Sequence, residues 1–221
     1  MKYLILLILL SCAHRDVNLT GTLKDMLVSD HSPVQGKLTK DKVHPTLKSQ
    51  WMGKYWQLQE GFDLLQDTES ATVSVRFKLE SVPTEPQDII ALSVGSATSS
   101  ASSRFSIRIS QGQITAILRA GDAEQAQEYK STGAALRVNQ WHTVTVVANY
   151  SKNAANIYLD GNKLEGAGTL KFSQMKTAAT PSASMAISSE DDGSTFFFHG
   201  KVAQILIWRR ELSREEVYEL Y

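Results

Sequence analysis

Apolar and polar residues alternate along much of the chain after residue 50. In the clearest stretch, Val73, Val75, Phe77 and Leu79 fall on one side and polar residues fall on the other. Successive side chains of a β-strand point to opposite faces, so this period of two predicts a strand with one buried face. Alternation or short apolar runs predict strands at residues 71–79, 89–94, 104–110, 113–118, 141–150, 156–160, 184–188 and 201–208.

Two dipeptides between predicted strands predict tight turns. Gln111-Gly112 separates two strands by only two residues, and Asp160-Gly161 follows the strand at residues 156–160. Aspartate and glycine tolerate the positive φ angles that a type I′ turn requires. Short strands joined in this way, with almost no helical periodicity, predict an all-β, two-sheet antiparallel sandwich.

One short helix is predicted at the end of the sequence. Ser213 and Glu216 have the spacing of a capping box, in which each side chain binds the backbone amide of the other. Val217, Leu220 and Tyr221 form an apolar stripe after this start. We expect the stripe to pack against the sandwich.

The first eleven residues predict a signal peptide. The apolar run at residues 3–10 is far shorter than the ~20 residues that cross a bilayer. It ends in Leu-Leu-Ser-Cys, which resembles a bacterial lipobox, so we expect lipid to be attached at Cys12. The alternative is an ordinary secretory signal. Because Cys12 is the only cysteine, a disulfide within the chain is excluded.

Residues 12–50 are polar and have little sustained period, which is typical of a tether between a lipid anchor and a domain. An early strand around residues 47–51 is the alternative. Residues 51–221 then form the predicted folded domain. A lipidated Cys12 implies membrane anchoring in a bacterial cell envelope. Ala13, in place of an aspartate, favours the outer membrane or cell surface.

Charge balance argues against one class of partner. The chain has 23 Lys and Arg against 23 Asp and Glu, and removal of Lys2 would leave a net charge of −1. Nucleic-acid-binding domains usually have a strongly basic face. The composition therefore predicts no nucleic-acid partner.

Three segments in order resemble the laminin-G-like jelly-roll family of the concanavalin A-like lectin and glucanase superfamily. They are residues 71–78, the pair NQWHTV (139–144) and IYLDG (157–161), and the closing stretch from residue 198 to the chain end. The resemblance covers about residues 51–221. It implies a two-sheet jelly roll with a short C-terminal helix.

The resemblance also implies architectural roles for six residues. Trp141 is expected to fill the space between the sheets, and Gly200 to give a sharp entry into the last strand. An arginine near the helix, Arg210, is expected to brace it through hydrogen bonds. The six signature residues are Trp141, Asp160, Gly161, Gly200, Trp208 and Arg210.

Catalytic patterns are not found in the sequence. Glucanases of this fold carry paired carboxylates on one strand, and the predicted strands contain almost no acids. His142 and His199 lie at family signature positions, where structural or surface roles are simpler. A lyase site on the concave sheet is an open alternative, and Arg76, Arg108, Tyr129 and Tyr158 are its candidates. We expect the protein not to be an enzyme.

Two further sets of residues are candidates for binding. Glu190, Asp191 and Asp192 stand beside a glycine and supply the oxygen ligands that Ca²⁺ prefers, although a solvated loop has the same composition. Tyr55 and Trp56 could form an aromatic platform for a sugar, or pack at the edge of the core. Calcium is the one cofactor that these patterns suggest.

Together these patterns predict a membrane-anchored binding or adhesion module that recognises a carbohydrate or a protein partner. This conclusion depends on the fold resemblance, and folds do not determine functions. A polysaccharide-active enzyme on the same fold and a structural envelope lipoprotein are the alternatives.

Overall fold

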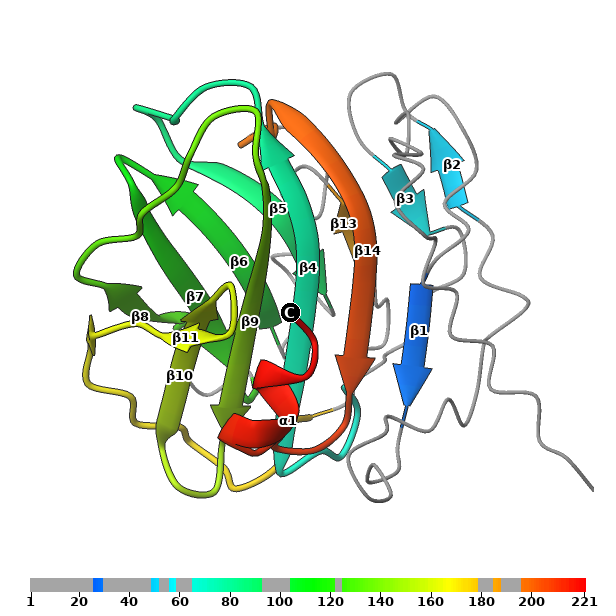
Figure 1. Cartoon of the computed structure of the whole chain (residues 1–221). Coiled ribbons are helices and arrows are strands. Elements are labelled where there is room, and N and C mark those ends of the chain that lie inside the picture. The colour runs from blue at the N-terminus through cyan, green and yellow to red at the C-terminus, as the bar shows by residue number, and fades with distance from the viewer. Residues whose placement is uncertain are drawn as a thin grey trace, which may run out of the picture.

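Two β-sheets stack face to face, and one short helix lies against the outer face of one of them (Figure 1). This computed structural model describes residues 65–92, 104–121, 125–178 and 196–221, together with the backbone of four further strands. The predicted all-β sandwich with a C-terminal helix is confirmed. Within the described residues, a helix with the length and apolarity needed to span a membrane is not found.

The six-stranded sheet contains the longest strands. Its neighbours pair antiparallel, except for the parallel pair of β1 and β14. In spatial order its strands are β1 (Met26–Ser29), β14 (Gly200–Trp208), β4 (Ser70–Leu79), β9 (Trp141–Asn149), β10 (Ala154–Leu159) and β11 (Asn162–Lys163).

The eight-stranded sheet lies behind it in Figure 1 and is antiparallel throughout. A β-bulge between Asp88 and Ile90 shifts the register of its central pair. In spatial order its strands are β12 (Gly166–Ala167), β8 (Gln127–Ser131), β7 (Gln113–Arg119), β6 (Arg104–Ser110), β5 (Gln87–Leu92), β13 (Met185–Ile187), β3 (Trp56–Leu58) and β2 (Ser49–Trp51).

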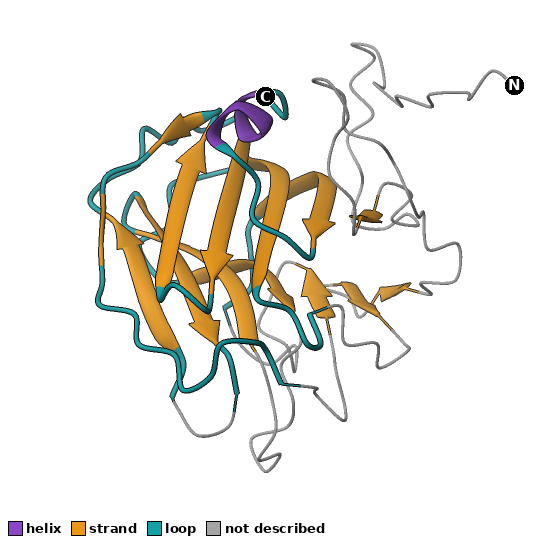
Figure 2. Ribbon diagram, turned by 90° about the horizontal axis from the view of Figure 1, so that it is seen from below, coloured by secondary structure: helices purple, strands orange, loops and turns teal. Residues whose placement is uncertain are grey.

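Figure 2 shows the two sheets facing each other. The core lies between them and is built from the alternation seen in the sequence. Val75 and Phe77 of β4 point inward, as do Phe105 and Ile107 of β6, and all four are fully buried. Each such side chain contributes about 1.5–3 kcal/mol to folding by leaving water. Because a shift of one residue would turn these side chains to the other face, period two alone determines which face of each strand is buried.

The helix α1 (Arg214–Tyr218) packs on the outer face of the six-stranded sheet. Both hydrogen bonds of the predicted capping box are present between Ser213 and Glu216. Val217 is buried and Leu220 is partly buried, in a second apolar cluster that includes Trp208. Tyr221 is 71% exposed, and it approaches the sandwich with its Cβ atom, which lies beside Gly161.

The prediction that Trp141 lies between the sheets is wrong, and the alternation of side chains along β9 explains why. Val144 and Val146 of β9 point into the core, so the even-numbered residues of this strand face inward. His142 therefore takes the inner position, where it is 2% exposed and contacts Phe77. Trp141 points to the outer face and is only partly buried. The tryptophan is a surface residue of the sheet and does not lie between the sheets.

The remaining predicted elements are found with shifts of a few residues at their ends. Gln111 and Gly112 connect β6 to β7 with φ angles of 50° and 72°, and Asp160 and Gly161 connect β10 to β11 with φ angles of 51° and 75°. Both are the predicted tight turns. Strands β1 and β2 lie in or at the end of residues 12–50, and the predicted ranges do not include β3, β8, β11 and β12.

Candidate functional site

A polar pocket of about 390 Å³ lies at one end of the sandwich, where β4 begins and β14 ends. Its wall combines two carboxylates, two cations and two hydroxyl groups. The lining residues are Asp67, Thr68, Glu69, Ser70, Lys176 and Arg209. They come from the approach to β4, the exit from β14 and the segment around residue 176.

The floor of the pocket is held by a dense set of hydrogen bonds around Thr177. The amide of Asp67 donates to the Thr177 carbonyl at 2.9 Å, and the amide of Thr177 donates to the Thr68 carbonyl at 3.0 Å. The Thr68 amide donates to the Thr177 hydroxyl at 2.9 Å, and that hydroxyl also donates to the Leu65 carbonyl. Thr68 and Thr177 are both buried. Two segments 109 residues apart are thus fastened together beneath the site.

Backbone geometry and ion pairs position the charged side chains at the rim. Asp67 adopts a left-handed conformation with φ 50°, which aspartate tolerates better than most residues. Its carboxylate lies 3.4 Å from the Lys176 ammonium group. The Arg209 guanidinium group donates to the Thr68 hydroxyl at 3.1 Å and to the Gln66 carbonyl. Both signs of charge therefore converge on one concave surface.

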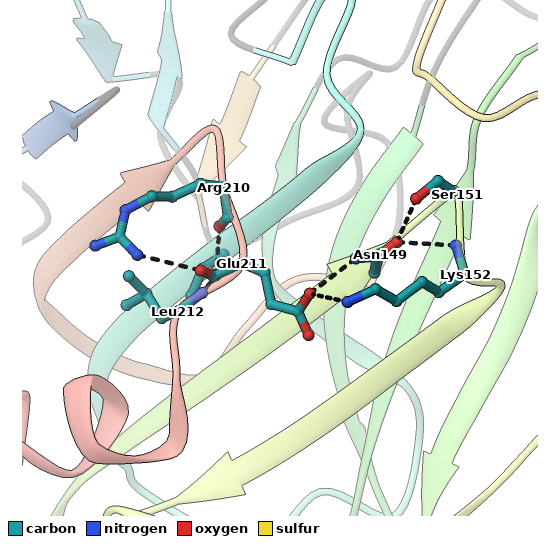
Figure 3. Close-up of polar contacts among 7 residues, drawn as sticks. Asn149, Ser151, Lys152, Arg210, Glu211 and Leu212 are labelled. Atoms are coloured by element: carbon teal, nitrogen blue, oxygen red, sulfur yellow. Dashed lines mark hydrogen bonds and ion pairs between the residues drawn. The ribbon is translucent and has the colours of Figure 1, made fainter. Parts of the chain in front are cut away.

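A network next to the pocket ties the turn after β9 to the segment before α1 (Figure 3). The Glu211 carboxylate accepts hydrogen bonds from the Asn149 amide group at 2.8 Å and the Lys152 ammonium group at 3.1 Å. Asn149 in turn accepts from the Ser151 hydroxyl at 3.0 Å and the Lys152 amide at 2.9 Å. Since Asn149 pairs with Ser70 of the pocket wall, this network borders the site.

The protonation of Glu211 follows from these contacts. Burial raises the pKa of its carboxyl group, but the hydrogen bonds from Asn149 and Lys152 and the charge of Lys152 outweigh burial and lower the pKa below its ordinary value. Glu211 is therefore ionised at neutral pH. It serves as a fixed acceptor that joins two connections at this end of the sandwich.

The chemistry of the pocket suits a polyhydroxylated ligand. Each sugar hydroxyl can donate one hydrogen bond and accept others, so carboxylates, ammonium and guanidinium groups are all suitable partners. Asp67 and Glu69 supply acceptors, and Lys176 and Arg209 supply donors. Within the described residues, no group of three metal-ligating side chains gathers in the pocket or elsewhere.

His142 and Asp160 form a separate, structural pair. The Nδ1 atom of His142 lies 2.7 Å from a carboxylate oxygen of Asp160, and Nε2 accepts a hydrogen bond from the Arg137 amide at 2.9 Å. The other Asp160 oxygen accepts from the Thr143 amide at 2.8 Å. Both partners of the buried imidazole are thus supplied by the fold, which assigns His142 a role in stability. His199 is exposed, as expected of a surface group.

The other signature residues have the expected structural positions. Gly200 begins β14 at a point where a Cβ atom would lie 2.2 Å from the Lys78 carbonyl oxygen, so the close approach requires glycine. Trp208 is 1% exposed and lies in the apolar cluster under α1. Arg210 pairs with Glu216 through two contacts of 2.9 Å, which confirms its predicted bracing of the helix.

The four residues of the open lyase alternative are not brought together. Arg76 is exposed on the outer face of the six-stranded sheet, while Tyr158 is buried in the cluster under α1. Arg108 pairs with the buried Asp88 in the eight-stranded sheet, with atoms 2.7 Å and 2.9 Å apart. Tyr129 packs against the core from β8. The structure therefore does not support this set of residues as one site.

Several predicted site residues lie outside the described part of the chain. These are the lipidation candidate Cys12, the calcium candidates Glu190, Asp191 and Asp192, and the sugar-platform candidate Tyr55. The backbone of Trp56 is described as the start of β3, and its side chain is not.

Sequence patterns did not indicate the pocket residues. Asp67 and Glu69 precede a predicted strand, Lys176 lies in an irregular segment, and Arg209 follows the last strand. The polar residues before β4 give a signal for a turn, but a turn can face solvent or a cavity equally well. Only long-range contacts such as that of Thr68 with Thr177 bring the segments together.

Comparisons with known proteins agree with this fold. A laminin G model of the concanavalin A-like lectin/glucanases superfamily matches residues 52–218. A search of curated proteins finds no match.

Several solved structures resemble the chain at low sequence identity. The IT-sialidase CBM40 of Ruminococcus gnavus bound to α2,3-sialyllactose has a TM-score of 0.55 and 18% identity, over 70% of this chain and 83% of that one. A K499G mutant of the NanB sialidase of Streptococcus pneumoniae has a TM-score of 0.57 and 20% identity, over 75% and 27% of the two chains. The botulinum neurotoxin serotype D binding domain has a TM-score of 0.53 and 17% identity, over 76% of this chain and 40% of that one. At such low sequence identity, the similarity shows a shared fold alone.

Proposed function

The chain belongs to the concanavalin A-like lectin/glucanases superfamily, and we propose that it is a non-catalytic carbohydrate-binding module. The observation that carries this proposal is the pocket lined by Asp67, Glu69, Lys176 and Arg209. Its mixture of donors and acceptors is the kind of surface that saccharide hydroxyls bind. Its volume of about 390 Å³ suits one or two sugar rings.

Rigidity of the floor supports a binding role for the pocket. The hydrogen bonds of Thr68 and Thr177 hold the lining segments before any ligand arrives. A preformed site loses less conformational entropy when it binds, so more of the interaction energy appears as affinity. The structurally similar CBM40 of Ruminococcus gnavus binds α2,3-sialyllactose, which adds support at the level of the fold.

The first experiment is a glycan-array screen of the purified chain, with and without Ca²⁺. We expect selective binding to a small set of saccharides. Asp67→Asn and Glu69→Gln each remove an anionic acceptor from the pocket, so each should weaken binding about tenfold, the effect of ~1.5 kcal/mol. Glu165→Gln alters an exposed carboxylate outside the pocket lining and is the matched control.

The outcomes separate the possibilities. A blank array, or binding that neither pocket variant weakens, contradicts the proposed site. Binding that chelation abolishes would point to a Ca²⁺ site at Glu190, Asp191 and Asp192. Release of shortened saccharide from a bound polymer would identify an enzyme, and copurification with one fixed protein would identify a structural module.

Anchoring through Cys12 is a second proposal, based on the sequence Leu-Leu-Ser-Cys at residues 9–12. A lipid-anchored module in a bacterial cell envelope, at the outer membrane or cell surface, would hold bound glycan close to the cell. Mass spectrometry of the mature N-terminus tests it. Acylated Cys12 supports the proposal, and a free cysteine or a different cleavage site contradicts it.

A further inference from the structure

The end of the six-stranded sheet opposite the pocket carries a second polar surface, built around Trp141. Two adjacent rows of outward-facing residues form it. Lys201, Lys78 and Trp141 are paired across β14, β4 and β9 in one row, and Gln204, Arg76 and Thr143 are paired in the next. We call these six residues the Trp141 surface.

The aromatic ring lies among cations. The Lys78 ammonium group is 5.1 Å from the centroid of the Trp141 ring, and the Arg76 guanidinium carbon is 5.8 Å from it. Cations at such distances are attracted by the electron-rich face of the ring. This attraction holds both long side chains beside the tryptophan, so less freedom is lost when a ligand binds them.

The surface is accessible along the sheet. Figure 1 shows α1 over the other half of β4 and β9, where the outer face is buried and combines Val147 with polar residues such as Thr72 and Thr145. Beyond α1, Trp141, Thr143, Lys201 and Gln204 are partly exposed and Arg76 is exposed. Three strands spaced about 4.8 Å apart make a platform about 10 Å wide, which matches two or three linked sugar rings.

The charge of this surface is mostly positive. Its six residues include three cations and no carboxylate, and the exposed Glu80, two residues after Lys78, adds one carboxylate at its edge. The acid that follows β10, Asp160, directs both oxygens elsewhere, to His142 and the Thr143 amide. The two rows therefore create a positive potential that attracts an anionic group from outside.

We infer that the Trp141 surface is a second binding site, for saccharides that carry carboxylate or sulfate groups. The indole ring would stack on the apolar face of a sugar ring, while Arg76, Lys78 and Lys201 would bind its anionic groups. The inference depends on the proposed function only in that the ligand is a saccharide. The two sites are far apart, because Ser70 and Lys78 lie near opposite ends of β4, about 26 Å from each other.

Calorimetric titration of the purified chain with three hexasaccharides of equal length tests the inference. Hexagalacturonate carries carboxylates, a heparin hexasaccharide carries sulfates as well, and maltohexaose is neutral. We expect binding of an acidic hexasaccharide that weakens as the NaCl concentration is raised from about 50 to about 300 mM. Maltohexaose should not bind this surface.

Variants then locate the binding. Lys78→Gln, Arg76→Gln and Lys201→Gln should each reduce affinity for the acidic hexasaccharide up to about fivefold. Trp141→Ala should reduce it roughly three- to tenfold. Lys163→Gln removes an exposed cation of the same sheet and is the matched control. Because the three glutamine substitutions retain long polar side chains at surface positions, they keep the test valid even if Trp141→Ala is poorly folded.

Three results would overturn the inference. The first is unchanged affinity in the variant that combines all three glutamine substitutions. The second is loss of acidic-saccharide binding through Asp67→Asn or Glu69→Gln, which would place it in the pocket. The third is binding of phosphatidylglycerol vesicles, but of no hexasaccharide, with the same dependence on Trp141. Failure of the pocket variants alone would contradict the proposed function and leave this inference intact.

Discussion

Arg210 and Glu216 form a two-pronged ion pair, with Nη1 and Nη2 of the arginine each 2.9 Å from a different carboxylate oxygen. The same carboxylate accepts the Ser213 amide at 2.8 Å, so one side chain caps the helix and ties it to the end of β14. Arg210 also donates to the Glu211 carbonyl at 3.1 Å. A helix of five residues is too short to be stable in isolation, and these contacts join its packing in holding it to the sheet.

Arg210→Ala should therefore destabilise the protein. It removes both prongs of the pair and leaves the partly buried Glu216 with only its capping contact, at a cost of about 1–2 kcal/mol in the free energy of unfolding. Urea denaturation measures this cost. Arg214→Ala, on the exposed side of the helix, should change the free energy by less than about 0.5 kcal/mol. Equal effects of the two variants would contradict the bracing role.

Stability should decrease in acid because of two carboxylates. Burial raises the pKa of Glu211 and of Glu216, but hydrogen bonds and nearby cations outweigh burial, so both pKa values lie below 4.5 in the folded protein. A carboxyl group whose pKa is lower in the folded state than in the unfolded chain stabilises the fold at every pH above its ordinary pKa. This stabilisation is lost as the pH falls through 4.5 and then through the folded-state pKa.

Urea midpoints measured between about pH 7 and about pH 3 test this dependence. We expect little change from pH 7 to about pH 5.5 and a steady decrease below that. Glu216→Gln should flatten part of the decrease, whereas Glu219→Gln, which alters an exposed acid at the C-terminal end of the same helix, should leave it unchanged. If the urea midpoint depends on pH in the same way in the unaltered protein and in both variants, Glu216 does not contribute.

Asp160 should be more important for stability than its place in a turn suggests. It binds His142 at 2.7 Å and the Thr143 amide at 2.8 Å, and it adopts φ 51°. Asp160→Ala removes both bonds and puts alanine in a strained conformation, so we expect a loss of about 2–3 kcal/mol in thermal or urea unfolding. Asp160→Asn tolerates the same φ and can still accept the Thr143 amide, and should lose about 1 kcal/mol. A larger loss for asparagine than for alanine would contradict this account.

Gly200 and Gly133 form a matched pair for testing close packing. A Cβ atom at Gly200 would lie 2.2 Å from the Lys78 carbonyl oxygen and 2.7 Å from the Phe198 ring, whereas at Gly133 nothing lies within 4 Å. Gly200→Ala should cost about 2–3 kcal/mol, because strands β14 and β4 must separate. Gly133→Ala should be neutral or slightly stabilising, since it reduces the freedom of the unfolded chain. Similar melting temperatures for the two variants would show that the contact at Gly200 relaxes easily.

The sequence by itself determined the class of fold and most of the strands. Alternation at Val73, Val75 and Phe77 depends only on the geometry of one strand, and so does the buried face that it predicts. The turns at Gln111-Gly112 and Asp160-Gly161 and the capping box at Ser213 are also local, because their hydrogen bonds or φ angles involve neighbouring residues. Local patterns of this kind can be interpreted before any long-range contact is known.

Only the tertiary structure decided where the polar side chains meet. The pocket joins Thr68 to Thr177 across 109 positions, and no local pattern specifies such a pairing. The inner position next to Trp141 belongs to His142, because the alternation along β9 that turns Val144 and Val146 into the core also turns His142 inward, and the size of the tryptophan does not override it. The sequence of β8, Gln-Glu-Tyr-Lys-Ser, has Tyr129 as its one large apolar side chain, so it shows no apolar alternation that would predict a strand. Local propensity selects strands and turns. A binding surface depends on which strands become neighbours, and that is determined by contacts between residues far apart in the sequence.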